Sequence, residues 1–246
     1  VVTVRVDVSC DTFSLIEASL KLLALTVRGE YYYITLISSD TLPLRANEEI
    51  REFFVRKRGK KFVYEKPLRR EHTKRFRYEY PGIDLRDKAL PVRVRHAIKR
   101  RFGLYPRNRF RKMMPPLAFG SNWITITAAF RDYIFHYLAD NIAFVEAFRY
   151  ASCGDEHFFQ TILKQSPFYE NNDKLRYMYV DWTTGPQKPR TLDESDFDRL
   201  DKAVSDTTDD SFYIYARKFS DSLDLAAYRE RFLTDEDEEL NDRPDE

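Results

Sequence analysis

The spacing of apolar positions changes twice near the start of the chain. Residues 1–8, VVTVRVDV, alternate β-branched with polar side chains, a period of two that is typical of a strand. From Thr12 to Leu25 the apolar residues take helical spacing, and Gly29 is placed to stop that helix. Residues 31–37, YYYITLI, are almost wholly apolar, as expected for a strand buried on both faces of a sheet. This order predicts a β-α-β unit.

Similar patterns predict the later elements. A helix is expected to begin at Asn47, as its N-cap, with Glu48 and Glu49 in the first turn. The loop before it follows the carboxyl end of the second strand, where open α/β sheets bind ligands. The remaining expected elements are helices over 89–102, 128–150 and 193–204 and strands over 120–127, 176–182 and 212–219.

The distribution of charge divides the chain more sharply than its composition does. The net charge is only +1, but residues 56–112 hold 22 Lys and Arg against 5 Asp and Glu, whereas residues 193–246 hold 7 against 19. Residues 234–246, with the run DEDEELNDRPDE, are too charged to bury a face and are expected to be a solvated tail. We predict one globular domain over 1–233, with 56–112 as a basic insertion, because 246 residues suffice for one large core.

Several functional classes lack their usual sequence signals. Two cysteines, Cys10 and Cys153, exclude a disulfide framework, and no apolar run is long enough to span a membrane. The chain contains no P-loop, no G-x-G-x-x-G and no G-x-S-x-G elbow. His157 has Cys153 and Asp155 nearby but no second ligand pair, and the other histidines, His72, His96 and His136, are scattered, so no metal site is expected.

Two polar groups within apolar surroundings are candidate chemistry. In CGDEHFFQTIL, Asp155 and Glu156 either cap a helix or include a general base held at the helix N-terminus. Arg217 and Lys218 end an apolar strand-like segment. They are either ordinary surface charge or cations whose stems are anchored in the core while their heads reach a cleft. From the residues alone, both alternatives remain open for each group.

The composition of the basic segment 56–112 does not decide which kind of molecule it contacts. Its interleaved Lys, Arg, Tyr and Phe residues are compatible with nucleic-acid binding, since cations pair with phosphates and aromatic rings stack on bases. It matches no nucleic-acid module. A solvated basic face, or one that rests on anionic lipid or on an acidic glycan, fits the same composition.

Six segments in this order resemble the Core-2/I-branching β-1,6-N-acetylglucosaminyltransferase family, which includes the peptide O-xylosyltransferases. They are VDVSCDTFSLIEASLKLL, ISSDTLPLRANEEI, FGSNWITIT, GDEHFFQTILKQSPF, RYMYVDW and YARKFSD. The resemblance implies a GT-A-like α/β fold with a central mixed, mostly parallel sheet flanked by helices. It also implies transfer of a sugar from a UDP-sugar to a glycan hydroxyl, with inversion and without a metal or other cofactor. The D-x-D sequence Asp196-Phe-Asp198 lies in a polar helix, and we interpret it as surface.

The resemblance also assigns roles to residues. By motif position, Glu156 falls on the family's catalytic base, and Arg217 with Lys218 falls on the basic pair that holds the donor diphosphate. Arg190 falls on a further phosphate contact. Trp123 and Trp182 match positions that line the cleft for the sugar and the acceptor.

Three positions depart from the family pattern. Cys10, on the donor-binding side, stands where relatives have Trp-Gly. The acid of the family's loop lies one place earlier, at Asp40, among the residues expected to contact sugar or acceptor. Asn122 replaces the Asp of the xylosyltransferases, which favours N-acetylglucosamine over xylose as the donor sugar.

The absence of a signal-like segment and of a cysteine framework favours a bacterial cytoplasmic enzyme over a Golgi one. We expect it to build a surface polysaccharide and to contact the inner face of the membrane peripherally through the basic segment. Two alternatives remain: a nucleic-acid or polyanion-binding module that uses 56–112, and an inactive partner subunit of the same fold.

Overall fold

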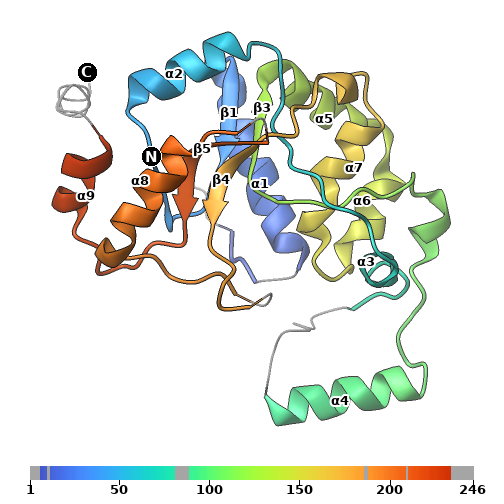
Figure 1. The fold of residues 1–246 in the computed structure, drawn as a ribbon. Helices are drawn as coiled ribbons and strands as arrows, with labels where there is room; N and C mark the ends of the chain where they lie inside the picture. The colour runs from blue at the N-terminus through green and yellow to red at the C-terminus, as the bar shows by residue number, and fades with distance from the viewer. Residues whose placement is uncertain (1–5, 10–11, 81–88, 186–187, 209, 234–246) are drawn as a thin grey trace. The chain divides into compact units, whose positions relative to one another are not determined.

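The computed structural model describes residues 6–9, 12–80, 89–185, 188–208 and 210–233 (Figure 1). The first predicted strand, residues 1–8, falls mostly outside this part, and the described residues 6–8 form no strand. Cys10 and the predicted acidic tail 234–246 also lie outside the described residues. The described chain clusters into two compact units, each formed from two separate stretches of sequence.

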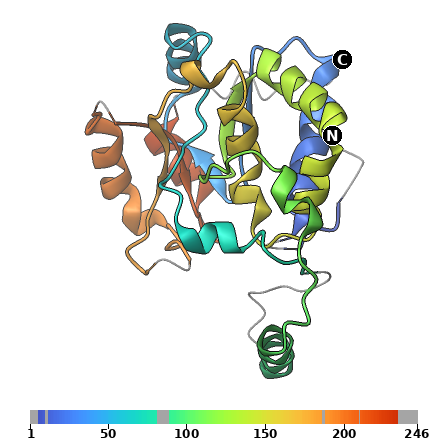
Figure 2. The same cartoon turned by 90° about the vertical axis from the view of Figure 1, so that its right-hand side faces the viewer.

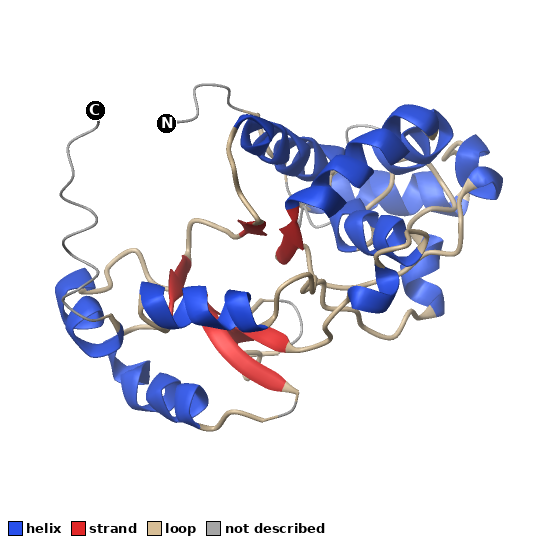
Figure 3. Cartoon of the chain, turned by 90° about the horizontal axis from the view of Figure 1, so that it is seen from above, coloured by secondary structure: helices blue, strands red, loops and turns tan. Residues whose placement is uncertain are grey.

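Unit 1 comprises residues 1–36 and 63–172, and its described elements are mainly helical (Figure 3). Its helices and strands are α1 (Phe13–Leu25), β1 (Tyr33–Leu36), α3 (Arg70–Lys74), α4 (Leu90–Arg101), β3 (Ile124–Thr127), α5 (Ala128–Asp140), α6 (Ile142–Arg149) and α7 (Phe158–Lys164). Its 3₁₀ turns are η1 (Thr26–Arg28), η2 (Arg109–Met113), η3 (Gly154–Glu156) and η4 (Tyr169–Asn171).

Two helices of unit 1, α1 and α5, have boundaries that coincide with side-chain hydrogen bonds to the backbone. Thr12 caps α1 through a hydrogen bond from the Ser14 N–H, and the chain then continues through η1 to Gly29. The helical pattern predicted over 128–150 is divided at Asn141. The Asn141 side-chain amide donates to the Tyr137 carbonyl at 2.8 Å, so α5 ends there and α6 starts immediately afterwards.

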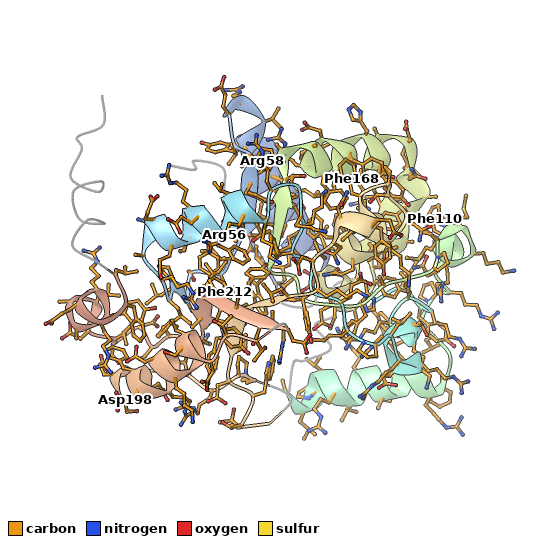
Figure 4. The ribbon with its side chains drawn as sticks, turned by 45° about the horizontal axis from the view of Figure 1, so that its top comes forward. Arg56, Arg58, Phe110, Phe168, Asp198 and Phe212 are labelled. Carbon is orange, nitrogen blue, oxygen red and sulfur yellow. The ribbon has the colours of Figure 1, made fainter. Side chains whose placement is uncertain are left out.

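The sheet of unit 1 is the antiparallel pair β1–β3, in which Ile34 faces Ile126. All four residues of β3 are buried, whereas β1 alternates between buried and half-buried positions. The expectation that β1 is buried on both faces is therefore wrong. The core around β3 consists of aliphatic and aromatic side chains from α1, α5, α6 and α7, and it includes Phe168, which packs on Phe130 at 5.5 Å (Figure 4).

Unit 2 comprises residues 37–62 and 173–246. Its described elements are β2 (Thr41–Pro43), α2 (Asn47–Arg56), β4 (Arg176–Val180), η5 (Glu194–Asp196), α8 (Phe197–Ser205), β5 (Ser211–Arg217) and α9 (Leu225–Phe232). The N-cap of α2 is Ala46, so Asn47 is the first helical residue and not the cap that the sequence predicts. Phe212, labelled in Figure 4, stacks on Phe53 of α2 at 4.8 Å and ties that helix to β5.

The sheet of unit 2 has the strand order β2-β5-β4, with β2 antiparallel and β4 parallel to β5 (Figure 1). The described strands thus form two small sheets, and one of their three pairings is parallel. This differs from the expected single, mostly parallel sheet. The mixed α/β class is confirmed, while the single domain over 1–233 stays a prediction. Among the described residues, no helix is both long enough and apolar enough to cross a bilayer.

Candidate functional site

Glu156 is the last residue of η3, a 3₁₀ turn that precedes the buried helix α7. Its side chain is 30% exposed and accepts a hydrogen bond at 2.5 Å from the guanidinium of Arg75. The expectation that Asp155 caps a helix is wrong, because the cap positions are Cys153 and His157 and neither makes a side-chain capping bond. Asp155 is buried and instead accepts from the Asn122 amide at 3.1 Å. The two adjacent carboxylates therefore have different partners.

The backbone around Glu156 is held by polar groups of the same motif. The N–H of Gly120 donates to the Glu156 carbonyl at 2.9 Å. Three fully buried side chains bind the neighbouring backbone of residues 118–121: His157 contacts the Ala118 carbonyl at 2.7 Å, Thr161 accepts from the Ala118 N–H at 3.0 Å, and Gln160 donates to the Ser121 carbonyl. Buried polar groups with such partners fix one local geometry, so the Glu156 backbone is preorganised.

His157 acts in this network as a neutral donor. Its Nδ1 must carry the proton to donate to the Ala118 carbonyl, and burial lowers its pKa to about 4. Its Nε2 is buried and has no hydrogen-bond partner in the part of the chain that the structure describes. Within that part, no group of three or more His, Cys, Asp and Glu side chains is placed to hold a metal ion. Metal independence stays a prediction.

Gly120 allows a second close approach beside Glu156. A Cβ at this position would lie 2.0 Å from the Tyr64 carbonyl oxygen, so only glycine fits without a backbone shift.

Asn122 and Trp123 follow in the same segment. Asn122 bonds to Asp155, and the Trp123 N–H donates to the Ser121 hydroxyl at 3.2 Å while its ring is half-buried. The structure thus brings three predicted residues of unit 1, Glu156, Asn122 and Trp123, into neighbouring segments.

A second cluster, in unit 2, joins three other predicted residues. Asp40 precedes β2, and the antiparallel pairing of Thr41 with Arg217 places it beside the end of β5. Its carboxylate lies 3.3 Å from the Arg217 guanidinium and 3.1 Å from the Lys218 ammonium, and it accepts from the Ser38 hydroxyl at 2.6 Å. We call Asp40, Arg217 and Lys218 the cation cluster, because its formal charge is positive.

In the cation cluster, burial and the neighbouring charges shift pKa values in opposite directions. Burial acts to raise the pKa of Asp40, but the Ser38 hydroxyl and the two cations outweigh it and lower that pKa overall. Burial lowers the pKa of Arg217, whose side chain is only 11% exposed, while Asp40 partly offsets the effect. The Lys218 side chain is 48% exposed. Lys218 can therefore reach an anion in solvent while Arg217 stays anchored in the fold.

Arg190 takes part in a separate ion-pair network of unit 2. It contacts Asp181 at 2.9 Å and also pairs with Asp196, and these two carboxylates are almost completely buried. Arg199 reaches Asp181 as well, at 2.8 Å. The interpretation of Asp196-Phe-Asp198 as surface is wrong for Asp196, whose side chain is 2% exposed, and right for Asp198, which is 95% exposed (Figure 4). The hydrogen bonds that Arg190 donates to the Asp181 and Asp196 carboxylates raise the pKa of Arg190.

Trp182 is the second residue after β4, next to Asp181, and is 45% exposed. Apart from Cys10, every predicted site residue can therefore be located. They fall into a group around Glu156 in unit 1 and a group in unit 2 that contains the cation cluster, Arg190 and Trp182.

A sequence model of the Core-2/I-branching enzyme family matches residues 1–202. The chain belongs to that family. Core-2/I-branching enzymes are glycosyltransferases, so the resemblance seen in the sequence motifs is confirmed at the level of the family and of its class of reaction. No curated protein matches the chain significantly.

The family match includes all the candidate residues of unit 1 but only some of those in unit 2. It includes Glu156, Asn122 and Trp123 of unit 1, and Asp40 and Arg190 of unit 2. The YARKFSD segment, with Arg217 and Lys218, follows the last matched residue. The role of that pair in a Core-2/I-branching enzyme therefore depends here on its chemistry and on its contact with Asp40.

Two residues beside Glu156 were not singled out from the sequence. Arg75 is one of many cations in the basic segment, and no spacing rule marks it as the partner of Glu156. Gly120 opens the family motif GSNW, but its close approach to Tyr64 depends on a contact with a distant stretch of chain. Only the tertiary structure of this Core-2/I-branching enzyme reveals both.

Proposed function

We propose that this member of the Core-2/I-branching family transfers a sugar from a UDP-sugar to a hydroxyl of a glycan, with inversion at the anomeric carbon and without a metal ion. In one displacement, the acceptor oxygen bonds to the anomeric carbon while the bond from that carbon to the UDP oxygen breaks. The acceptor proton passes to Glu156, and UDP leaves with the bonding electron pair.

The setting of Glu156 supports its role as the base. A carboxylate has two oxygens and about four lone-pair sites, so it can accept from Arg75 and from an acceptor hydroxyl together. The hydrogen bonds that hold its backbone and the Arg75 contact that holds its side chain keep the carboxylate in one position. A preorganised base is effective because little reorganisation is needed when the proton moves.

The cation cluster supports the departure of UDP. Negative charge grows on the diphosphate as the anomeric bond breaks, and fixed cations stabilise that charge. Lys218 is exposed enough to contact a phosphate, and Arg217 is anchored by burial and by Asp40. We assign N-acetylglucosamine as the preferred sugar, with xylose as the second candidate, from Asn122 in the GSNW motif.

The observation that carries the proposal is the ion-paired, preorganised Glu156 within residues that match a glycosyltransferase family. The first test is release of UDP from UDP-GlcNAc, UDP-xylose, UDP-glucose and UDP-galactose, with and without EDTA. We expect turnover with UDP-GlcNAc that EDTA does not reduce. Activity that appears only when manganese is added would contradict metal independence.

Matched variants test the two roles. Glu156→Gln is expected to lower turnover by about 10²- to 10⁴-fold with little change in UDP affinity, because only the proton acceptor is lost. Glu146→Gln is the control, since Glu146 is 31% exposed and is paired with Arg149 at 2.8 Å. Equal turnover in both variants would exclude Glu156 as the base.

For the diphosphate, Lys218→Ala is expected to weaken UDP binding in calorimetry by about tenfold, because one charge-assisted contact is lost. Lys57→Ala is the control: its ammonium is 41% exposed and lies 3.0 Å from Asp173 of the same unit. If both variants bind UDP as the wild type does, the cation cluster is not the diphosphate site.

A further inference from the structure

Helix α4 presents a row of apolar side chains to solvent. Leu90, Val94 and Ile98 follow one another at intervals of four residues, so they share one face of the helix. They are 70%, 48% and 48% exposed, and Phe102, one more interval along, is 71% exposed. We call these four residues the apolar row. Apolar side chains of this size are usually buried, and a row of exposed ones marks an interaction surface.

The same helix is strongly basic. Its twelve residues, LPVRVRHAIKRR, contain five Lys or Arg and no Asp or Glu. At about 100° per residue, Arg93, Arg95 and Lys99 lie outside the apolar row, whereas Arg101, at the last turn, lies on the same side as the row. The combination of an apolar face with a cationic one defines a basic amphipathic helix.

The partly buried side chains of α4 lie away from the apolar row. Among the α4 side chains that the structure describes, only Val92 and Lys99 are partly buried, and the others are exposed. The Lys99 ammonium lies 5.8 Å from the ring centroid of Tyr105, which is itself buried. At about 100° per residue, Val92 and Lys99 lie about half a turn from Leu90 and about a third of a turn from Ile98 around the helix axis. Figure 2 views this helix nearly along that axis.

We propose that α4 binds the surface of a membrane rich in anionic lipid, with the apolar row inserted at the boundary between headgroups and acyl chains and the cations at the lipid phosphates. A bilayer surface offers both chemistries at the required depth, since long cationic side chains reach the headgroups while apolar ones enter the hydrocarbon. This surface function is independent of the proposed reaction.

Two other partners fit the helix less well. A nucleic acid would neutralise the cations but leave the apolar row in water, because sequence-tolerant nucleic-acid binding uses phosphates and stacked bases. A second copy of α4 would cover the apolar row but would bring five further positive charges close to the first five. Lipid is the partner that matches both faces.

The test measures binding of the full chain to vesicles by flotation, with phosphatidylcholine alone and with phosphatidylcholine mixed with phosphatidylglycerol. We expect binding to the mixed vesicles only. Val94→Asp and Ile98→Asp should each weaken it at least about tenfold, because an apolar side chain that the membrane would bury is replaced by a charged one. Arg93→Gln with Arg95→Gln should weaken it about 30-fold, since each cation near an anionic surface contributes about fivefold.

Ile142→Asp is the control. Ile142 is 69% exposed at the start of α6, outside the basic segment, and its replacement should leave vesicle binding unchanged. Because all the altered side chains are exposed, each variant should keep the thermal melting temperature of the wild type, which circular dichroism verifies. Loss of binding with an unchanged melting temperature supports the proposal.

Three results would overturn it: equal binding to neutral and anionic vesicles, equal loss in Ile142→Asp and Ile98→Asp, or absence of vesicle binding. Retarded migration of a DNA or RNA oligonucleotide by the wild type, lost in Arg93→Gln with Arg95→Gln but not in Ile98→Asp, would assign the helix to nucleic acid instead. Self-association that Ile98→Asp abolishes, without vesicle binding, would assign it to a second copy.

Discussion

Replacing Arg190 with methionine tests how much the buried ion-pair network of unit 2 contributes to folding. Methionine keeps most of the volume of the side chain and removes its charge. The side chains of Asp181 and Asp196 are 3% and 2% exposed, so the variant leaves two buried carboxylates without their shared cation. Removing one partner of a buried pair commonly costs about 3–5 kcal/mol.

The remaining contacts reduce that cost. Asp181 keeps the Thr183 N–H at 2.8 Å and the guanidinium of Arg199, and Asp196 keeps the Asp193 N–H at 3.2 Å. We therefore expect a loss near the lower limit, about 3 kcal/mol, which lowers the melting temperature by about 6–12 °C in a chain of this size. Adding Asp196→Asn should restore part of the loss, because one uncompensated charge disappears.

Thermal unfolding followed by circular dichroism at about neutral pH measures the effect. Arg231→Met is the control, since Arg231 also contacts two carboxylates, Asp198 and Asp201, but both are more exposed, and ion pairs between exposed side chains contribute little to stability. Equal melting temperatures for the two variants would refute the reasoning. If Arg190→Met kept the wild-type melting temperature but lost affinity for UDP, the result would support the predicted role of Arg190 as a phosphate contact.

Acid should reduce the difference between Arg190→Met and the wild type. Burial acts to raise the pKa of Asp181, but hydrogen bonds from Thr183 and Arg190 outweigh it and leave that pKa well below its usual range. A carboxylate with a lowered pKa stabilises the fold above the unfolded pKa, about 4, and loses that contribution as the pH falls further. Melting at successively lower pH would contradict this if the difference stayed constant.

Three further predictions concern the two groups of candidate residues. Gly120→Ala should lower both the melting temperature and transferase turnover. Its Cβ would displace the Tyr64 carbonyl and, with it, the backbone that is bonded to Glu156. Unchanged turnover would show that the close contact between Gly120 and Tyr64 does not position the base. As the pH falls from about 6.5 to 4, His157 should lower the free energy of unfolding, because its imidazole takes up a proton only in the unfolded state. In His157→Asn, the free energy of unfolding measured in urea should change less over that pH range. Asp40→Asn should tighten UDP binding several-fold in calorimetry by removing a competing negative charge, and weaker binding would mean that Asp40 orients the cations.

Local patterns in the sequence predict most helices and several strands. The helix from Thr12, the basic helix near residue 90 and the strand at 176–180 follow from periodicity and capping, which depend on neighbouring residues. The division of the long helical pattern at Asn141 was missed, because it depends on one side-chain amide that takes up a carbonyl of the helix. Sheet organisation was also missed, since strand pairing depends on contacts between distant segments.

The candidate site is predictable only in part, for the same reason. Motif resemblance identifies Glu156, and the structure adds Arg75, which lies 81 positions away along the chain. The contact of Asp40 with sugar or acceptor stays a prediction, and the structure adds its pairing with Arg217 and Lys218. Charge patterns alone do not specify such pairs, because many combinations of side chains could satisfy them.

The interrupted course of the chain through its two units constrains the order of folding during synthesis. All segments of unit 1 have been translated once the ribosome passes Asn172, whereas unit 2 begins at residue 37 and needs β5 to complete its sheet. Asp40 and Arg217 are 177 positions apart, so the early strand β2 waits for nearly the whole chain before β5 can pair with it. Removal of residues 211–246 would delete β5 and leave β2 as an unpaired edge prone to aggregation.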